Sequence, residues 1–354
     1  MPHARPTIGD VARAAGVSKG TVSLAYSGKR PVAEETRRRI FAAAEALRWT
    51  ASSSAKALAT SRTSTIGLVI ARRPEIIATD TFFPRFLAGC EAVLAEAGLG
   101  LMLNVVTDED AETAAYERYA GGRVDGVILL DVERDDRRLD LVRDLGLPAA
   151  MLSAEAPPAD SPDDVPVVYT EDAAAVEELA RLLVDAGHTS IAHVAGPLRY
   201  VHAAARRDAF VAAIASHGLA PDQVVEGDFT AASGRDATAA LLGRAEPPTA
   251  IIYANDVMAI AGLSYARSRG LRVPEDLSVT GFDDSELSAH LSPGLTSVST
   301  GADIRGAATA RTLLAALAGE AEASVALDCT TVVQRDSIMP PATTTPTRPR
   351  GARR

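Results

Sequence analysis

From Thr65 onward the chain alternates short, almost uninterrupted apolar runs with longer amphipathic segments. The runs are IGLVI, LGLMLNV, VDGVILL, LPAAMLS, TSIAHVAG, PTAIIYAN and DLSVTGFD, and the segments between them include FLAGCEAVLAEAG and AVEELARLLVDAG. Strands that are apolar on both faces are typical of parallel sheets covered by helices on both sides. Because about 270 residues of this pattern exceed one typical domain, the sequence predicts two doubly wound α/β lobes. We expect a ligand site where the strands end, in the cleft between the lobes.

A different pattern comes first, in the stretch TIGDVARAAGVSKGTVSLAYSG near the N-terminus. Thr7 and Ser18 are good N-cap residues, and Asp10 is placed to complete a capping box with Thr7. Gly16 suits the left-handed conformation that ends one helix and turns the chain. The stretch therefore predicts an all-α helix-turn-helix head, with an ordinary helical hairpin as the alternative. A third helix is predicted over residues 34–49, EETRRRIFAAAEALRW.

The head is basic, although the chain as a whole is acidic. Residues 1–64 carry eleven Lys and Arg against four Asp and Glu, whereas the 354-residue chain has a formal net charge of −10. Phosphates respond to the local patch of charge, so an acidic body does not exclude nucleic-acid binding. A basic head on an acidic body indicates a nucleic-acid-binding module.

The composition argues against several other classes of protein. The sequence contains no run of eighteen apolar residues, the length that a membrane span requires. The stretch MPHARPTIGD lacks the apolar core of a signal peptide. We therefore expect a cytoplasmic protein with no membrane partner. Cys90 and Cys329 are too far apart for a metal or redox motif, and the six histidines show no ligand spacing. Without a Walker loop, GxSxG or HExxH, the sequence predicts no catalytic residue, metal site or cofactor; an enzyme acting on sugars is the alternative.

Two segments flanking the α/β region lack its pattern. Residues 51–63 hold a serine cluster and then SAKALA, which has the propensity for one helical turn. So short a helix is not stable in water by itself, so it needs DNA or a partner subunit to fold against. Residues 340–354 are rich in Pro, Thr and Arg and are predicted to be disordered, as a solvated tail or as a contact to a polyanion.

In this order, the motifs resemble the LacI/GalR family of transcriptional regulators from about Thr7 to Ser337. The first stretch is similar to the family's helix-turn-helix signature. The series VDGVILL, DAGHTSIAHVAGPL, PTAIIYANDVMAIAGL and LRVPEDLSVTGFDDSELSAHLSPGLTSVS is similar to its periplasmic-binding-protein-like core. The resemblance implies a DNA-binding domain, a hinge helix with linker, and an effector-binding and dimerisation core, over residues 5–50, 51–63 and 64–339. Within the core it implies a first lobe of about 64–167 and 300–327, and a second lobe of about 168–299 and 328–339.

The resemblance also implies which residues contact DNA. The second helix enters the major groove, with Lys19 and Gly20 in the positions of the principal base-reading residues. Leu24 stands where most members have an arginine, so contact with a thymine methyl takes the place of a guanidinium–guanine contact. The remaining contacts, mainly to phosphates, are assigned to Thr7, Ser18, Thr21 and Ser23.

The SAKALA turn resembles the family's hinge helix, which folds on operator DNA and is paired across a homodimer. Leu58 takes the position of the leucine that wedges into the minor groove, and Lys56 lies close to the DNA backbone. The alternative is that Leu58 only caps the core of the first lobe. Trp49-Thr50-Ala51-Ser52 stands in place of the usual Tyr-x-Pro-Asn, which makes the approach to the hinge less rigid.

For the second lobe, the resemblance implies polar effector contacts at strand ends. Arg206, Asn255 and Asp283 match positions that hydrogen-bond ligand hydroxyls in sugar-responsive members. Phe229 matches an aromatic residue that packs on a sugar ring. Taken without the family, Asn255 and Asp283 are equally explained as turn or helix-cap residues and Phe229 as core filling.

The first-lobe side of the expected pocket is less recognisable. Arg72 and Arg73 follow the first strand, and Ser153 replaces a common acidic residue after MLS. Arg72 and Ser153 are the candidate effector residues from this lobe. Two arginines at the mouth favour an acidic sugar or phosphosugar, unless they face solvent.

The implied function is a sequence-specific DNA-binding transcriptional regulator, a repressor of operator DNA controlled by a small sugar-like effector. Control follows by linkage, because the effector binds two lobe arrangements unequally. A homodimer is favoured over a tetramer because the tail has no leucine heptads. A solute-binding transport protein with the same core is the alternative, which the basic head and the missing signal peptide disfavour.

Overall fold

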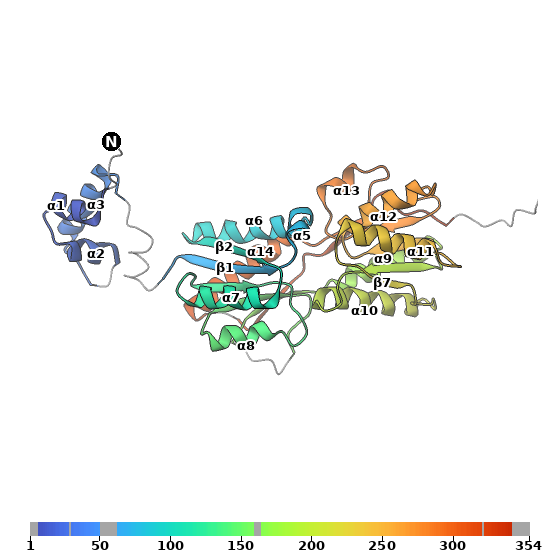
Figure 1. Ribbon diagram of the computed structural model, residues 1–354, viewed down its shortest axis with the longest axis horizontal. Helices are drawn as coiled ribbons and strands as arrows, with labels where there is room; N and C mark the ends of the chain where they lie inside the picture. The colour runs from blue at the N-terminus through green and yellow to red at the C-terminus, as the bar shows by residue number, and fades with distance from the viewer. Residues whose placement is uncertain (1–5, 28–29, 50–61, 159–163, 321, 342–354) are drawn as a thin grey trace, which may run out of the picture.

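The computed structural model describes residues 6–27, 30–49, 62–158, 164–320 and 322–341. These residues form a three-helix head followed by two α/β lobes that lie end to end (Figure 1). The fold class predicted from the sequence, a helix-turn-helix head followed by a core of doubly wound parallel sheets, is confirmed.

The head consists of three short helices: α1 (Ile8–Ala15), α2 (Lys19–Ser27) and α3 (Glu34–Ala46). They enclose a small apolar core, in which Val11, Val22 and Ile40 have no exposed surface. Gly16 adopts φ 66° between α1 and α2, a left-handed conformation that a residue with a Cβ rarely takes. The predicted turn at this glycine is confirmed.

The third helix is shorter than the sequence predicted. It ends at Ala46 instead of Trp49, because Arg48 takes φ 48° and turns the chain back. The Trp49 N–H donates to the Ala44 carbonyl at 2.8 Å, and the Trp49 ring packs edge-on against Tyr26 with centroids 5.3 Å apart. Trp49 therefore closes the core of the head.

The first lobe is built on a six-stranded parallel sheet with the order β11–β5–β4–β3–β1–β2. Its strands are β1 (Thr65–Ala71), β2 (Gly100–Val106), β3 (Gly126–Leu129), β4 (Ala149–Ser153), β5 (Val167–Thr170) and β11 (Ser324–Leu327). One face is covered by α6 (Phe82–Glu96) and α14 (Ala302–Ala318), and the other by α7 (Glu109–Ala120) and α8 (Arg137–Asp144). Burial of both faces explains why the inner strands β1, β3, β4 and β5 read as continuous apolar runs.

The second lobe repeats this plan with four parallel strands in the order β7–β6–β8–β9. The strands are β6 (Ile191–Ala195), β7 (Val224–Glu226), β8 (Ala250–Tyr253) and β9 (Ser278–Thr280). One face is covered by α9 (Ala173–Asp185) and α10 (Val201–Ser216), and the other by α11 (Ala231–Leu242) and α12 (Asp256–Ser268). The remaining elements are the antiparallel pair β10 (Ser297–Ser299) and β12 (Thr331–Val333) and the short helices α5 (Pro74–Thr79) and α13 (Glu286–His290).

The chain crosses between the lobes at three places, after β5, after β10 and after β11. Asp172, Thr300 and Thr330 lie in these three crossings. Strand β5 continues to Thr170, past the expected change of lobe near residue 167, because Thr170 still pairs with Leu327 of β11. The domain limits themselves stay predictions.

Helices α6 and α14 of the first lobe touch backbone to backbone. A Cβ added to Gly89 would lie 2.0 Å from the Asp303 carbonyl oxygen, and one added to Gly306 would lie 2.1 Å from the Phe86 carbonyl oxygen. Real Cβ atoms do not approach so closely, so glycine on each helix is what permits this contact. The two helices therefore behave as one packed layer on the sheet.

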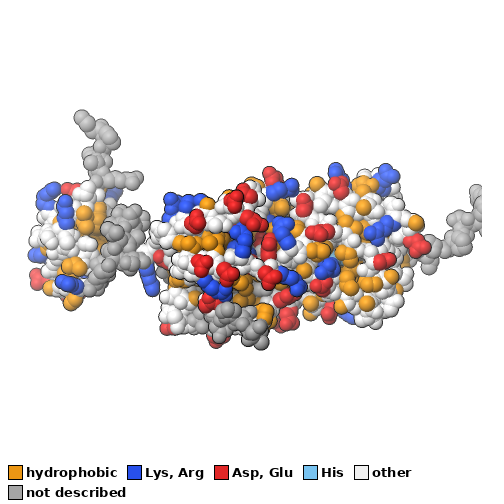
Figure 2. All heavy atoms as spheres, turned by 60° about the horizontal axis from the view of Figure 1, so that its bottom comes forward, with side chains coloured by type: hydrophobic (Ala, Val, Ile, Leu, Met, Phe, Trp, Pro, Cys, Tyr) orange, Lys and Arg blue, Asp and Glu red, His pale blue; other side chains and the backbone are white. Residues whose placement is uncertain are grey.

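The described surface agrees with the charge pattern of the sequence. Lys and Arg side chains are prominent on the head in Figure 2, whereas both signs are mixed on the body. In the described parts of the chain, no helix has both the length and the apolar character that a membrane span requires.

Candidate functional site

Helix α2 presents its first residues to the surface. Lys19 and Gly20 are exposed, and Ser18 Oγ accepts a hydrogen bond from the Thr21 N–H at 3.0 Å, so Ser18 caps the helix. The Ser18 and Thr21 hydroxyls are also 2.9 Å apart and hydrogen-bonded. The stem of Lys19 lies across α1, where a Cβ on Gly9 would come 3.0 Å from its Cε. The glycine leaves room for Lys19 between the two helices.

The remaining predicted DNA contacts on the head lie on α1 and further along α2. Thr7 is exposed, and its N–H and hydroxyl both donate to the Asp10 carboxylate, at 2.9 and 2.7 Å, which confirms the capping box. Ser23 and Leu24 are half-buried on α2. The predicted hinge residues Lys56 and Leu58 lie outside the described residues. The DNA roles of all of these residues stay predictions.

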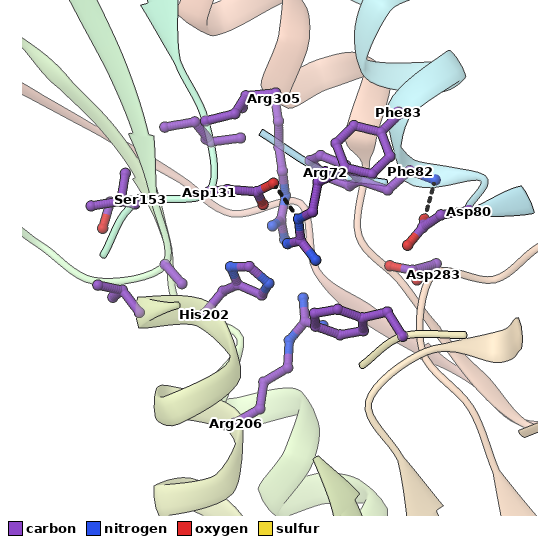
Figure 3. Close-up of a pocket in the computed structure, with 16 residues that line it drawn as sticks. Arg72, Asp80, Phe82, Phe83, Asp131, Ser153, His202, Arg206, Asp283 and Arg305 are labelled. Atoms are coloured by element: carbon purple, nitrogen blue, oxygen red, sulfur yellow. Dashed lines mark hydrogen bonds and ion pairs between the residues drawn. The ribbon is translucent and has the colours of Figure 1, made fainter. Parts of the chain in front are cut away.

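A cavity of about 70 Å³ lies between the two lobes (Figure 3). Its charged, polar and aromatic lining residues are Arg72, Asp80, Phe82, Phe83, Asp131, Ser153, His202, Arg206, Phe229, Asp283 and Arg305. A space of this size holds a few water molecules, whereas pockets for drug-sized ligands measure about 300–1,000 Å³. A ligand larger than a few waters therefore needs more room than this space alone provides.

Five of the six predicted effector residues line this cavity: Arg72, Ser153, Arg206, Phe229 and Asp283. They come from the ends of β1 and β4, from α10, and from the loops after β7 and β9. Carboxyl ends of parallel strands from both lobes thus meet at one place, as the general rule for such sheets requires.

Asn255, the sixth predicted residue, is buried and is not among the residues that line the cavity, although its side chain hydrogen-bonds Asp80. Its Oδ1 accepts from the Met258 N–H at 2.9 Å as the N-cap of α12, and its Nδ2 donates to the Phe229 carbonyl at 3.1 Å. Phe229 itself has φ 67°, an unusual conformation for a residue with a side chain, and the amide of Asn255 holds it there. In this structure Asn255 is a helix cap that positions Phe229.

The two neighbouring arginines after β1 differ in burial and in partner. Arg72 is buried, with 6% of its surface exposed, and its Nε donates to Asp131 Oδ2 at 2.8 Å. Arg73 is 59% exposed on its side chain and lies 3.9 Å from Asp228 across the lobe boundary. The expectation of two arginines at the mouth is therefore met by Arg72 alone, and a carboxylate already compensates its charge.

The other two arginines of the cavity, Arg206 and Arg305, are tied to one buried carboxylate, Asp172. Arg206 donates to Asp172 Oδ2 from Nε at 3.0 Å and from Nη2 at 2.6 Å, and its Nη1 donates to the Ala254 carbonyl at 3.1 Å. Arg305 donates to Asp172 Oδ1 at 2.8 Å. Burial alone would raise the pKa of Asp172, but the guanidiniums of Arg305 and Arg206 hold it well below its usual range. Arg206 thus has three nitrogens engaged with protein groups.

Arg305 links Asp172 to the other two crossings between the lobes. Its Nε donates to the Thr300 carbonyl at 2.6 Å, and its Nη2 donates to Thr330 Oγ1 at 2.8 Å. The Thr330 hydroxyl is also 3.3 Å from Asp172 Oδ1. Arg305 and Asp172 therefore fasten all three crossing segments at one point, which we call the hinge node (Asp172, Arg206, Thr300, Arg305 and Thr330).

Two carboxyls from opposite lobes face each other at one end of the cavity, Asp80 and Asp283 (Figure 3). Burial raises the pKa of Asp283 well above its ordinary value, and the charge of Asp80 raises it further. Burial also raises the pKa of Asp80, against the opposing effects of the Phe82 N–H and Arg72. Both carboxyls therefore lose their protons at a higher pH than an ordinary aspartic acid does. They can accept hydrogen bonds from ligand hydroxyls once the lobes part.

Aromatic rings of the second lobe form a stack along the cavity. His202 lies between Tyr200 and Phe229, with ring centroids 5.6 and 5.7 Å away and planes inclined by 12° and 22°. Burial lowers the pKa of His202 to about 3, so its imidazole is neutral at physiological pH. The stack offers a flat face of the kind that packs against a sugar ring.

Several lining residues were not predicted: Asp80, Asp131, His202, Arg305 and the node residue Asp172. Asp131 and Asp172 follow the apolar stretches of β3 and β5 closely, so the rule that ligands bind at carboxyl strand ends would have found them. Arg305 and His202 lie inside helices with no local signal. Among the described residues, no three or more His, Cys, Asp or Glu side chains are arranged to hold a metal ion.

Comparison with known proteins agrees with this geometry. Residues 7–52 match the bacterial regulatory proteins of the lacI family, and residues 180–338 match the periplasmic binding protein-like domain. The HTH-type transcriptional regulator CelR of Thermobifida fusca is 32% identical over 325 residues, which cover 91% of this chain and 95% of that protein.

Solved structures give the same result. The transcriptional regulator CelR–cellobiose complex is 31% identical with a TM-score of 0.72, covering 94% of this chain and 100% of the other. The lac repressor dimer bound to operator and the anti-inducer ONPF is 26% identical with a TM-score of 0.81, covering 95% of this chain and 100% of the other.

The hinge node generates a stability prediction. Asp172→Asn should lower the free energy of unfolding by about 3–5 kcal/mol, because it leaves Arg206 and Arg305 buried without their counter-charge. Asp185→Asn is the matched control, since Asp185 pairs with Arg181 on the surface and is 60% exposed. Urea unfolding of both variants measures the difference, and equal stability of Asp172→Asn and Asp185→Asn would contradict the role of the node.

The facing carboxyls generate a pH prediction. A carboxyl with a raised folded-state pKa binds a proton that the unfolded chain releases, so its stabilisation is lost as pH rises through the folded pKa. Asp80→Asn removes one charge and lowers the cost of ionising Asp283. The fall in Tm between pH 4.5 and pH 8 should therefore be smaller in Asp80→Asn than in the unmodified protein. Asp110→Asn, at an exposed position on α7, should keep the unmodified slope; identical slopes in all three proteins would refute the coupling.

Proposed function

The chain is a member of the LacI family of bacterial regulatory proteins, and we propose that it is a repressor whose operator binding is controlled by a neutral sugar held between its two lobes. It is a DNA-binding transcriptional regulator, not an enzyme. The observation that carries the proposal is the cavity at the meeting of both lobes, with an aromatic stack on one side and facing carboxyls on another. A cytoplasmic location belongs to the same proposal, since the operator is there.

In the proposed DNA complex, α2 lies in the major groove. Lys19 and Gly20 lead the helix and are exposed, as a base-reading position requires. Ser18, Thr21, Ser23 and Thr7 anchor the head on phosphates through hydroxyls and helix-end N–H groups. Leu24 contacts a thymine methyl, and Leu58 with Lys56 acts at the minor groove. The basic head supports this proposal.

The charges of the cavity favour a neutral sugar over an acidic one. Arg72 is compensated by Asp131, while Arg206 and Arg305 share Asp172. Asp80 and Asp283 then add acceptors and no further cation, so an anionic ligand would meet no uncompensated positive charge. Hydroxyls donating to the two carboxyls, with a ring face on Phe229, suit a neutral sugar. The cellobiose held by the CelR relative supports the same ligand class.

The proposed control is a linkage between the two sites of a homodimer. An effector that binds one arrangement of the lobes better than another shifts the population of DNA-competent dimers. A coupling free energy of about 1–3 kcal/mol gives a change of roughly 5–150-fold in operator affinity. The alternative of a transport component does not account for the helix-turn-helix head.

We predict that Lys19→Ala weakens operator binding by about 1–3 kcal/mol and relaxes base preference at one position of each half-site. The operator is first recovered by selection from random duplexes with the full chain. Titrations at several salt concentrations then separate base from phosphate contacts. Arg181→Ala, on the surface of the second lobe, serves as control. An unchanged base preference with a shallower salt slope would make Lys19 a phosphate contact.

We predict that Asp283→Asn weakens the response to effector while operator binding without effector survives. Replacing a carboxyl of the cavity by an amide removes hydrogen-bond acceptors for ligand hydroxyls, which costs about 1–3 kcal/mol of ligand binding. Isothermal titration with cellobiose, followed by operator titration with and without the sugar, measures both effects. Arg206→Ala should differ from Asp283→Asn, because it removes a partner of Asp172 and lowers the Tm.

A set of other neutral disaccharides and their monosaccharides extends the titration. Binding of an anionic sugar in preference to all neutral ones would contradict the charge argument. An Asp283→Asn protein that melts normally and still responds at unmodified sugar concentrations would contradict the placement of the site.

A further inference from the structure

Arg72 occupies the centre of the inter-lobe cavity and contacts both lobes. It follows β1 in the first lobe, where Asp131 holds its Nε at 2.8 Å. Its Cζ lies 4.0 Å from the ring centroid of Tyr200 and 5.1 Å from that of Phe229, both in the second lobe. Figure 3 shows the guanidinium pointing into the cavity from the first-lobe side.

The surroundings of Arg72 are typical of a cation packed against aromatic rings. Guanidinium groups placed over aromatic faces within about 6 Å of the ring centroid are stabilised by them, more strongly when water is excluded. Only 6% of Arg72 is exposed, so its contacts are largely desolvated. The imidazole of His202, stacked between the two rings, is neutral and so adds no positive charge that would repel the guanidinium.

We propose that Arg72 is a resident occupant of the effector site: its guanidinium takes the aromatic face of Phe229 and Tyr200 in the empty protein, holds the lobes together, and must be displaced by the sugar. The identity of the ligand that displaces Arg72 rests on the proposed function. The contact of Arg72 with Tyr200 and Phe229 that holds the lobes together, which we call the clamp, does not depend on it. Arg72 then sets two properties at once, the separation of the empty lobes and the free energy that the effector must overcome.

The adjacent arginine provides the matched comparison. Arg73 has the same charge and follows at the next position, but its side chain is 59% exposed and approaches only Asp228, at 3.9 Å. A role that depends on charge near the cleft would be shared by both residues. A role that depends on occupying the aromatic face belongs to Arg72 alone.

The first experiment needs neither DNA nor effector. Small-angle X-ray scattering of the full chain measures the radius of gyration of the unmodified protein, Arg72→Ala and Arg73→Ala. Arg72→Ala leaves Asp131 unpaired, so the double variant Arg72→Ala with Asp131→Asn is measured beside it, and a thermal melt checks that each protein folds. We expect a larger radius of gyration for both Arg72 variants and an unchanged one for Arg73→Ala.

Chemical rescue sharpens this test. Methylguanidinium at tens of millimolar should refill the vacated face in Arg72→Ala and restore the smaller radius of gyration, while leaving the unmodified protein unchanged. Scattering curves of both Arg72 variants that superpose on the unmodified protein would overturn the clamp, whatever the sugar results.

The second experiment tests the competition with cellobiose as the probe. Isothermal titration should give a Kd lower by roughly threefold to thirtyfold in the double variant, the range expected for removing a desolvated cation–aromatic contact. Weaker binding than in the unmodified protein would make Arg72 an effector ligand and overturn the competition. If the unmodified protein binds no neutral sugar, the proposed effector class fails, and the scattering experiment alone decides the clamp.

Discussion

The arrangement of the two lobes depends on one buried ion cluster at the hinge node. Asp172 accepts from Arg206 of the second lobe and Arg305 of the first, and Arg305 in turn holds Thr300 and Thr330. Burying three charges is costly unless each is paired and hydrogen-bonded. Here the geometry satisfies that condition, so the cluster fixes where the three crossing segments lie relative to each other. The node therefore sets how the cavity-lining residues of one lobe are placed relative to those of the other.

The contacts on the cavity side are of a different kind. Arg72 on its aromatic face and Asp80 facing Asp283 each join the lobes through groups that a ligand can replace. The node residues Arg206 and Arg305 also line the cavity, but their hydrogen bonds run to the buried Asp172 carboxylate and to backbone carbonyls. A binding event in the cavity can therefore exchange the weaker contacts while the node stays intact. A rotation of one lobe about the node would exchange the cavity contacts and keep those of the node.

The sequence predicted the fold better than it predicted the site, for a physical reason. Continuous apolar runs follow directly from burial of both sheet faces, and Gly16 and Asp10 act on residues a few positions away. The site depends on pairs distant in sequence. Arg206 lies 34 residues from Asp172, and Arg305 lies 133 residues from it, so no local pattern showed that these charges neutralise one another. The sequence wrongly predicted that the third helix includes Trp49, because the packing of Trp49 on Tyr26 is likewise a tertiary contact that no local pattern shows.

The close contact of α6 with α14 has a mechanical consequence. Glycines at positions 89 and 306 bring the two backbones together, which leaves no flexible side-chain layer to absorb a displacement. The first residues of α6, Phe82 and Phe83, line the cavity, and the helix then runs for 15 residues, about 22 Å, toward the end of the lobe where the chain arrives from the head (Figure 1). A displacement of Phe82 and Phe83 by a ligand would therefore move α6 and α14 together as a rigid unit, including the far end of α6.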